Sequence, residues 1–222
     1  MLTGRRHQKR GFTLVETVVT VGIVAALAAV VYPTVVKQFD TADPTRAAED
    51  LGSIATAIEA FGVNVRPQQP KDIEDLTNVI RTTLASGDST ALGTAYSTTD
   101  SANWRGPYLA VSVPASVLAV DTVINTGFSG AIPNHLELFN SAGTNGGTVE
   151  LTANSANADY LAVQVLGLSG AAFNAINLLI DGASEKNATQ RRQSGRFRCP
   201  GASPTDGAAC AAAFYLASPL RH

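Results

Sequence analysis

The chain has few charged side chains, and this narrows the functions open to it. Only 15 % of its 222 residues are Asp, Glu, Lys or Arg, against about 25 % in an average domain. Its formal net charge is −2, whereas a general nucleic-acid binder usually carries a basic surface. A weakly charged chain rich in Ala, Thr, Ser and Gly is better suited to packing against copies of itself. The length allows one globular domain with a long helix, or two small domains.

Histidine is also scarce, and the motifs of common enzymes are missing. Of the three histidines, His7 and His222 lie near the ends of the sequence, which leaves His135 alone in its body. There is no GxSxG, HExxH, P-loop or dinucleotide-binding pattern. The glycine-rich stretch 143–147 opens no helix pattern, so a hairpin loop is expected there rather than a phosphate-binding loop. We therefore predict a protein that is not an enzyme and has no cofactor.

What the sequence does have is a long apolar run at its N-terminus. A leader, residues 1–11, holds four basic residues and no acid, and residues 17–36 hold no ionisable side chain except the Tyr32 phenol. As a helix, the segment 12–36 would be about 37 Å long, enough to cross a hydrocarbon core of ~30 Å. The basic leader is expected to stay in the cytoplasm and to direct the C-terminus outward. A conventional secretory signal peptide, cut within residues 25–29, is the alternative.

One acidic residue, Glu16, interrupts the start of this apolar segment. An ionised carboxylate inside a bilayer costs at least ~2.5–3.5 kcal/mol, so it usually has a partner and a function. The alternative is a glutamate at the membrane edge whose side chain reaches back to water. Position alone leaves both interpretations open.

The hexapeptide Gly-Phe-Thr-Leu-Val-Glu at residues 11–16 lies between the short basic leader and the apolar run. This arrangement resembles the prepilin signal of type IV pilins and type II secretion pseudopilins. In that family a membrane-bound prepilin peptidase cuts after the glycine, and the new N-terminal residue is methylated. The resemblance implies cleavage between Gly11 and Phe12, N-methylation of Phe12, and a role in assembly for Glu16.

A pairing between Glu16 and a cleaved N-terminus has a physical basis. Cleavage would create a positive amine on Phe12 that must lie among apolar side chains. A buried ammonium needs an opposite charge close by. Glu16 of a neighbouring subunit can supply that charge and set the register between two helices. The expected partners are identical or related pilin subunits and an inner-membrane assembly platform.

The location and use of such a filament stay open at this point. The subunit is expected to span the inner membrane once, with its C-terminus outside, and then to enter a periplasmic or cell-surface filament. A surface pilus would serve adhesion, motility or DNA uptake, whereas a pseudopilus would serve protein secretion. The competing class is a membrane-anchored, exported binding domain that does not polymerise and that retains residues 1–11.

The resemblance and the hydrophobic pattern together predict an α+β pilin fold. The N-terminal helix is expected to have an assembly half at 12–36 and an amphipathic half at 37–65, followed by a globular head at 66–222. The amphipathic half carries apolar residues three and four positions apart. These are Leu51, Ile54, Ile58, Phe61 and Val65. This stripe is expected to pack on an antiparallel sheet.

Glycine and proline mark the expected irregularities of the N-terminal helix. Gly22 and Pro33 are predicted kink positions, since a proline removes one backbone donor. Asp43–Pro44 is expected to bend the helix again or to restart it. The helix is expected to end before the Arg66–Pro70 segment.

The region after this break contains a second predicted helix and a loop. The helix would carry acids in its first turn and apolar residues on one side. Those apolar residues are Ile73, Leu76, Ile80 and Leu84. Residues 86–103 are polar and predict a long surface loop. The next segment, Trp104–Leu109, resembles the part of pseudopilins and some pilins where the connecting loop enters the sheet. The calcium loop that follows it in major pseudopilins has no counterpart beyond Asp121, so no metal is predicted.

The second half of the sequence predicts strands and one helix. The candidate strands are 108–113, 117–124, 135–139 and 149–152, with a further strand around Leu161, Val163 and Val165. Ser169 is the expected N-cap of a helix that carries Phe173, Ile176 and Ile180 and ends at Asp181–Gly182.

The two cysteines, Cys199 and Cys210, lie eleven positions apart. In an exported segment such a pair predicts a disulfide, worth roughly 3 kcal/mol for so short a loop. Two free buried thiols are the alternative. A zinc site would need more ligands, and no CxxC or HxxxH spacing is present. The head should therefore have a disulfide-closed C-terminal region.

One basic cluster follows the predicted helix. It consists of Lys186, Arg191, Arg192, Arg196 and Arg198. The simple interpretation is a solvated loop. The alternative is contact with DNA or another polyanion, which would weaken steeply as salt is added.

Overall fold

The computed structural model of the chain describes residues 14–82, 88–118, 121–125, 130–141, 158–182, 187, 192–200, 205 and 207–221. The side chains at positions 14, 16, 24, 26 and 28–42 are outside this description. The chain divides into two compact units, Met1–Ala42 and Asp43–His222. The second unit contains the sheet and the hydrophobic core, and it has the predicted α+β architecture.

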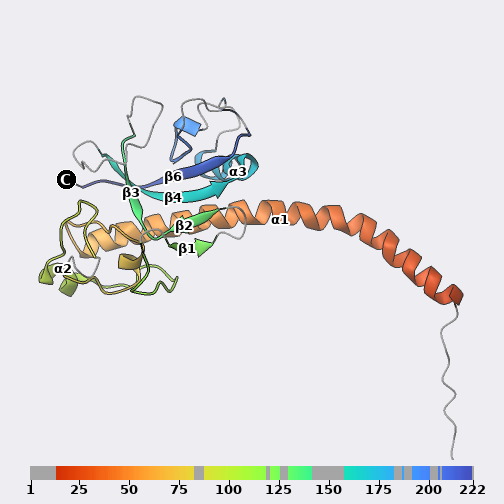
Figure 1. Cartoon of the computed structure of the whole chain (residues 1–222), viewed down its shortest axis with the longest axis horizontal. Helices are drawn as coiled ribbons and strands as arrows, with labels where there is room; N and C mark the ends of the chain where they lie inside the picture. The colour runs from red at the N-terminus through yellow and green to blue at the C-terminus, as the bar shows by residue number, and fades with distance from the viewer. Residues whose placement is uncertain are drawn as a thin grey trace, which may run out of the picture. The chain divides into compact units, whose positions relative to one another are not determined.

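Helix α1 runs from Leu14 to Asn64 (Figure 1). It passes through Pro33 and through Asp43–Pro44 without interruption, so the helix does not restart at Asp43–Pro44. A proline removes one backbone donor, but the remaining hydrogen bonds of the turn hold the helix together. Bends at Gly22 and Pro33 stay predictions. Among the described residues, no helix is both long enough and apolar enough to span a membrane.

The second half of α1 is the spine of the head, as predicted. Five apolar side chains that share one face are at most 1 % exposed. They are Leu51, Ile54, Ile58 and Phe61 of the helix and Val65, which directly follows its last residue. Full burial of one such side chain is worth about 1.5–3 kcal/mol, so this stripe fixes the helix to the rest of the head.

The sheet has six strands in the described part of the chain, and every pair is antiparallel. The strands are β1 (Thr122–Asn125), β2 (Ala131–Pro133), β3 (Leu136–Phe139), β4 (Tyr160–Leu168), β5 (Phe197–Arg198) and β6 (Cys210–Pro219). Their order is β1-β2-β4-β6-β5, and β3 also pairs with β4. Figure 1 shows β4 and β6 side by side at the centre of the head.

Strand β4 supplies both faces of the sheet, because successive side chains of a strand point in opposite directions. Leu161, Val163 and Val165 are buried in the large core that also contains the apolar stripe of α1. Ala162 belongs to a second, smaller cluster with Phe139, Phe214 and Leu216. The predicted alternation at 161–165 is therefore confirmed.

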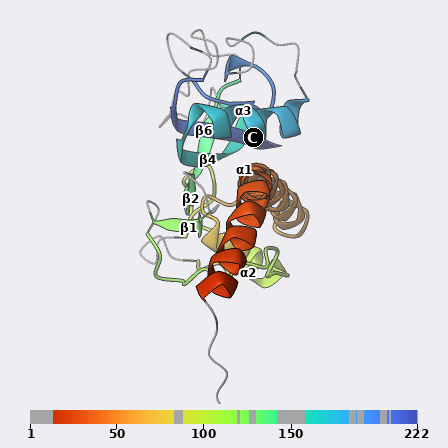
Figure 2. The same cartoon turned by 90° about the vertical axis from the view of Figure 1, so that its right-hand side faces the viewer.

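Helix α3 spans Gly170–Asp181 and has the predicted boundaries. The Ser169 hydroxyl accepts a hydrogen bond from the Ala172 amide, which caps the first turn. Gly182 ends the helix with a φ of 66°, a left-handed conformation that glycine adopts at little cost. The helix packs beside β5 and β6 (Figure 2).

The prediction of a helix after the Arg66–Pro70 break is wrong. Only one turn of 3-10 helix forms there, η1 (Glu74–Leu76), although Ile73, Leu76 and Ile80 are buried as the pattern required. Backbone groups of this segment bond to distant parts of the chain, since the Ile73 amide donates to the Asn134 carbonyl at 2.7 Å and the Leu76 carbonyl accepts from the Tyr108 amide at 2.8 Å. Leu84 lies outside the described residues. The spacing of the apolar residues therefore identified buried positions correctly, but it did not indicate a helix.

The predicted surface loop at 86–103 is only partly a loop. It contains the short helix α2 (Thr98–Asn103), whose N-terminus is closed by a capping box between Ser97 and Asp100. It also contains Tyr96, which is 2 % exposed and whose ring centroid lies 6.1 Å from that of Phe61.

Two predicted strands are also corrected. Residues 108–113 form no strand, because the Tyr108 amide donates to the Leu76 carbonyl and so ties this segment to η1. Within 117–124 the described residues 117, 118 and 121 form no strand, and strand β1 begins at Thr122. The predicted strand 149–152 lies outside the described residues. The predicted strand at 135–139 forms as β3, which begins at Leu136.

Candidate functional site: the N-terminal half of helix α1

The first unit presents an aliphatic surface. Six of its aliphatic side chains are between 54 and 70 % exposed. They are Val15, Val18, Val19, Val21, Ile23 and Leu27. Exposure of single apolar side chains is ordinary, but six of them within four turns of one helix form a continuous apolar surface.

This aliphatic surface is not confined to one stripe. At about 100° per residue, the six positions span roughly 240° of the circumference of the helix. A helix that packs against one neighbour needs only a narrow apolar face, whereas a helix that is apolar on nearly all sides belongs inside a membrane or among several other helices. The N-terminal half of α1 therefore has the surface of a segment that is buried on most sides.

The residues predicted to carry assembly lie in or just before this half. Gly11 and Phe12 precede the described residues, and the Glu16 side chain is outside the description although its backbone is in α1. Gly22 is exposed, and a methyl group added there would meet no other atom of the chain within 4 Å. Small residues in membrane helices allow two helix backbones to approach closely, so Gly22 leaves room for a second helix.

The comparison with known families concerns this same segment. Residues 6–32 match the family described as the prokaryotic N-terminal methylation motif. The chain is prepilin-like. The matched range contains Gly11, Phe12, Glu16 and Gly22, and it coincides with the aliphatic half of α1. A prepilin-type signal implies a structural rather than an enzymatic protein and an exported head anchored at a membrane.

A curated relative gives a second, more distant likeness. The type II secretion system core protein G of Pseudomonas aeruginosa (strain PAO1) is 42 % identical to the prepilin-like chain over 57 residues. These residues make up 26 % of this chain and 40 % of that protein, so the chain spans less than half the length of the relative. No solved structure matches the chain significantly.

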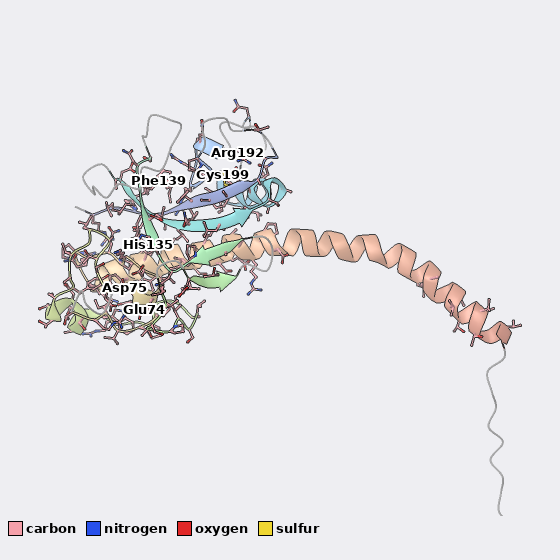
Figure 3. The ribbon with its side chains drawn as sticks, viewed as in Figure 1. Glu74, Asp75, His135, Phe139, Arg192 and Cys199 are labelled. Atoms are coloured by element: carbon pink, nitrogen blue, oxygen red, sulfur yellow. A yellow bond between two sulfur atoms is a disulfide. The ribbon has the colours of Figure 1, made fainter. Side chains whose placement is uncertain are left out.

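The predicted disulfide is present between Cys199, which follows β5, and Cys210, which opens β6 (Figure 3). Neither cysteine is free. Arg192 lies against this disulfide and is only 5 % exposed. Its Nη1 donates to Cys199 Sγ at 3.3 Å, and its guanidinium carbon lies 5.1 Å from the centroid of the Phe173 ring. The interpretation of Arg192 as part of a solvated loop is therefore wrong, because its guanidinium packs inside the head.

Two other members of the predicted basic cluster also make contacts within the head. Arg196 donates to the Leu216 carbonyl and lies 4.9 Å from the centroid of the Tyr215 ring. Arg198 donates to the Ser141 carbonyl at 3.0 Å, and burial lowers the pKa of its guanidinium. Each of these arginines therefore satisfies backbone carbonyls of the head. Lys186 and Arg191 lie outside the described residues, and contact with a polyanion stays a prediction.

His135 occupies a surface site between two acids. Its Nδ1 lies 3.2 Å from Asp72 Oδ1, and its Nε2 lies 3.8 Å from Glu137 Oε2. The side chain is 30 % exposed. Both ring nitrogens of His135 thus face a carboxylate of the head.

The sequence analysis missed one group of functional interest, a buried acidic cluster formed by Glu74, Asp75 and Asp88 (Figure 3). The three residues are 5 %, 1 % and 2 % exposed. Two were assigned to the first turn of a helix, where acids are common, and the third to a surface loop. No spacing in the sequence pointed to them, because the fold brings Asp88 back to η1.

Burial controls the protonation of this cluster. It raises the pKa of Asp75 well above the usual range, and the carboxylates of Asp72 and Asp88 add to the effect. Burial, and then Asp88, likewise raise the pKa of Glu74. Arg81 opposes the second shift, with its Nη2 3.8 Å from Glu74 Oε2. Burial therefore favours the protonated forms of Asp75 and Glu74 unless a further positive charge is present.

Proposed function

We propose that the chain is the subunit of a type IV pilus-like or pseudopilus filament. The observation that carries this proposal is the coincidence of two features in one segment. The methylation motif covers residues 6–32, and the described side chains of the same segment form the aliphatic surface of α1. Processing would release residues 1–11, and the segment 12–36 would pass from the inner membrane into the filament core.

Assembly would use two kinds of contact. Apolar packing of the aliphatic surface against neighbouring helices supplies most of the affinity, through van der Waals contacts that replace contacts with lipid. Glu16 then supplies specificity, by pairing with the N-methylated amine of Phe12 in a neighbouring subunit. An unpaired charge in this apolar core would be expensive, so only one axial register satisfies both groups. The head, Asp43–His222, would face outward from the core.

The pairing is tested by Glu16→Ala, with Glu49→Ala as the matched control. Glu49 is an exposed acid on the part of α1 that belongs to the head. Cells that carry only the Glu16→Ala chain should process it and keep it in the membrane, but they should yield at least about tenfold fewer sheared filaments. The measurement is the filament fraction against the membrane fraction by immunoblot, since a single lost buried ion pair is worth several kcal/mol.

The control should assemble as the unaltered chain does. Normal filament yield from Glu16→Ala would refute the pairing. The N-terminal sequence and mass of mature protein test the processing step separately. A mature chain that begins with methylated phenylalanine supports it, and a chain that retains residues 1–11 would favour the membrane-anchored domain that does not polymerise.

A secretion pseudopilus is the form of filament favoured by one particular observation. The relative that shares 42 % identity over 57 residues is a type II secretion core protein. Deletion of the gene should then abolish export of secreted enzymes and leave surface adhesion and motility intact. The reverse pattern would identify a surface pilus.

A further inference from the structure

The buried acidic cluster has the dimensions of a cation site. Glu74, Asp75 and Asp88 each offer one carboxylate oxygen, and these three oxygens lie within 4.8 Å of one another. Calcium binds oxygen at about 2.3–2.6 Å, so two ligands of one ion are separated by at most about 5 Å. Three oxygens at such separations can share one ion after at most small shifts of their side chains.

Asp75 provides an independent indication of a ligand. Its side chain is 1 % exposed, and its Oδ1 atom has no hydrogen-bond partner. A buried carboxylate oxygen without a partner costs about 1–3 kcal/mol or more, so such an atom is seldom left in place without a reason.

The other oxygen of Asp75 is held from three directions. Its Oδ2 accepts the Lys71 amide at 3.2 Å, the Asp72 amide at 3.4 Å and the Tyr96 hydroxyl at 3.0 Å. These bonds hold the carboxylate in place and leave its buried Oδ1 as the atom still without a hydrogen-bond partner. A ligand atom that is oriented before the ion arrives loses little freedom on binding.

The charge balance points the same way. Arg81 is the cation that contacts the cluster among the described residues, through Asp88 and Glu74. It donates to both oxygens of Asp88 but not to Asp75. When all three acids are ionised, one guanidinium leaves two negative charges uncompensated. A divalent ion would neutralise these two charges. Without an ion, protonation of the carboxylates would remove them.

We propose that Glu74, Asp75 and Asp88 bind a hard divalent cation, with calcium as the best fit. Carboxylate oxygens select hard ions over zinc or copper, and calcium tolerates irregular sets of six to eight oxygens. Magnesium needs a near-ideal octahedron, which three acids from an irregular segment do not provide. The ion links η1 to the segment that begins at Asp88. The site precedes Trp104–Leu109 in sequence and is thus separate from any loop that follows that segment.

The experiment uses the full chain in detergent after treatment with EDTA. Calcium is titrated calorimetrically, and Tb³⁺ serves as a luminescent substitute. Tyr96 donates to Asp75 Oδ2 and Trp104 Nε1 donates to the Asp75 carbonyl at 3.0 Å, so both rings are placed to sensitise a bound Tb³⁺. Bound Tb³⁺ should luminesce, and calcium should displace it.

Three variants make the test specific. Asp75→Asn keeps the shape of the side chain but removes its charge, and it should weaken calcium binding by roughly a hundredfold or more, beyond the ~10–100-fold loss typical of a residue that only orients a ligand. Arg81→Gln removes the competing positive charge and should tighten binding. Glu49→Gln, an exposed acid outside the cluster, should bind as the unaltered chain does.

The outcomes distinguish a cation site from a group of buried acids that binds no ion. Absence of calcium binding and of sensitised Tb³⁺ in the unaltered chain would overturn the proposal, as would unchanged binding in a folded Asp75→Asn variant. If Asp75→Asn does not fold, Arg81→Gln decides: weaker or equal calcium binding refutes the site. Binding of magnesium with equal strength would refute calcium as the preferred ion.

Discussion

The disulfide between Cys199 and Cys210 allows a quantitative prediction. The bond joins the segment after β5 to the first residue of β6, with a sequence separation of 11. In the chain-entropy description, closing a loop of about this size in the unfolded state is worth roughly 3 kcal/mol. Reduction should therefore lower the free energy of unfolding of the head by about 3 kcal/mol.

Reduction isolates the crosslink from the packing of the sulfur atoms. Both cysteines are at most 5 % exposed, and a reducing agent opens the bond but leaves both sulfurs in place. The double variant Cys199→Ala with Cys210→Ala removes the sulfurs as well, together with the acceptor of Arg192 Nη1. Its loss should exceed that of reduction by about 1 kcal/mol, the net worth of one hydrogen bond.

The assay is urea unfolding of the full chain in detergent, followed by the fluorescence of the single tryptophan, Trp104. This residue belongs to the head, and its ring centroid lies 5.6 Å from that of Tyr108. In thermal unfolding the same loss should lower Tm by about 6–12 °C, at roughly 2–4 °C per kcal/mol for a domain of this size. A loss below about 1 kcal/mol on reduction would refute the reasoning. So would an equal response to reductant in the variant without cysteines.

Two further predictions concern the stability of the head. A methyl group on Gly170 would overlap the Gly207 carbonyl, so Gly170→Ala should destabilise the head by about 1–3 kcal/mol in the urea assay. Gly52 lies on a half-buried part of α1 where an added methyl group meets no atom within 4 Å, so Gly52→Ala should stabilise the head by roughly 0.5–1 kcal/mol. Equal effects of the two changes would contradict the overlap. Because the pKa of Asp75 is raised in the folded state, its contribution to stability is fully present below its unfolded value of 3.8 and is lost as the pH rises through the folded pKa. In EDTA, the unfolding free energy of the unaltered chain should therefore decline between pH 4 and 7, by about 1.4 kcal/mol for each pH unit that separates the folded and unfolded pKa values of Asp75. Asp75→Asn should flatten this decline. An unchanged slope would show that Asp75 does not titrate in this range.

Features with local causes could be predicted from the sequence. The stripe from Leu51 to Val65 depends only on helical periodicity, and the Ser169 cap depends only on its own turn. The disulfide followed from the presence of just two cysteines. The prepilin-type signal is likewise a contiguous pattern, and the matched range confirms it at the level of the motif.

Features that depend on distant partners could not be predicted. Strand β6 is rich in alanine and has weak strand propensity of its own, and it forms because β4 supplies a complete ladder of partners. The apolar spacing of Ile73, Leu76 and Ile80 was assigned to a helix, but long-range backbone bonds such as that from the Tyr108 amide to the Leu76 carbonyl take the place of helical ones. Hydrophobic periodicity does not indicate which backbone groups will bond to distant parts of the chain.

The basic and acidic clusters show the same limit for sites. Arg192 looked like a loop residue in sequence, but a disulfide and the Phe173 ring surround it in the head. Asp75 looked like a helix-capping acid, but burial makes it the centre of the acidic cluster. The chemistry of both residues depends on which surfaces the fold closes over them, and sequence spacing does not encode that.

The place of β6 in the sheet has a consequence for export. Every other described strand precedes β6 in sequence, yet β6 lies between β4 and β5 and pairs with both. A chain that leaves the ribosome, or whose head crosses a membrane in sequence order behind an anchored N-terminal helix, cannot finish this sheet until residue 219 has emerged. The central place between β4 and β5 therefore stays vacant until the last strand has arrived, and the head closes only then.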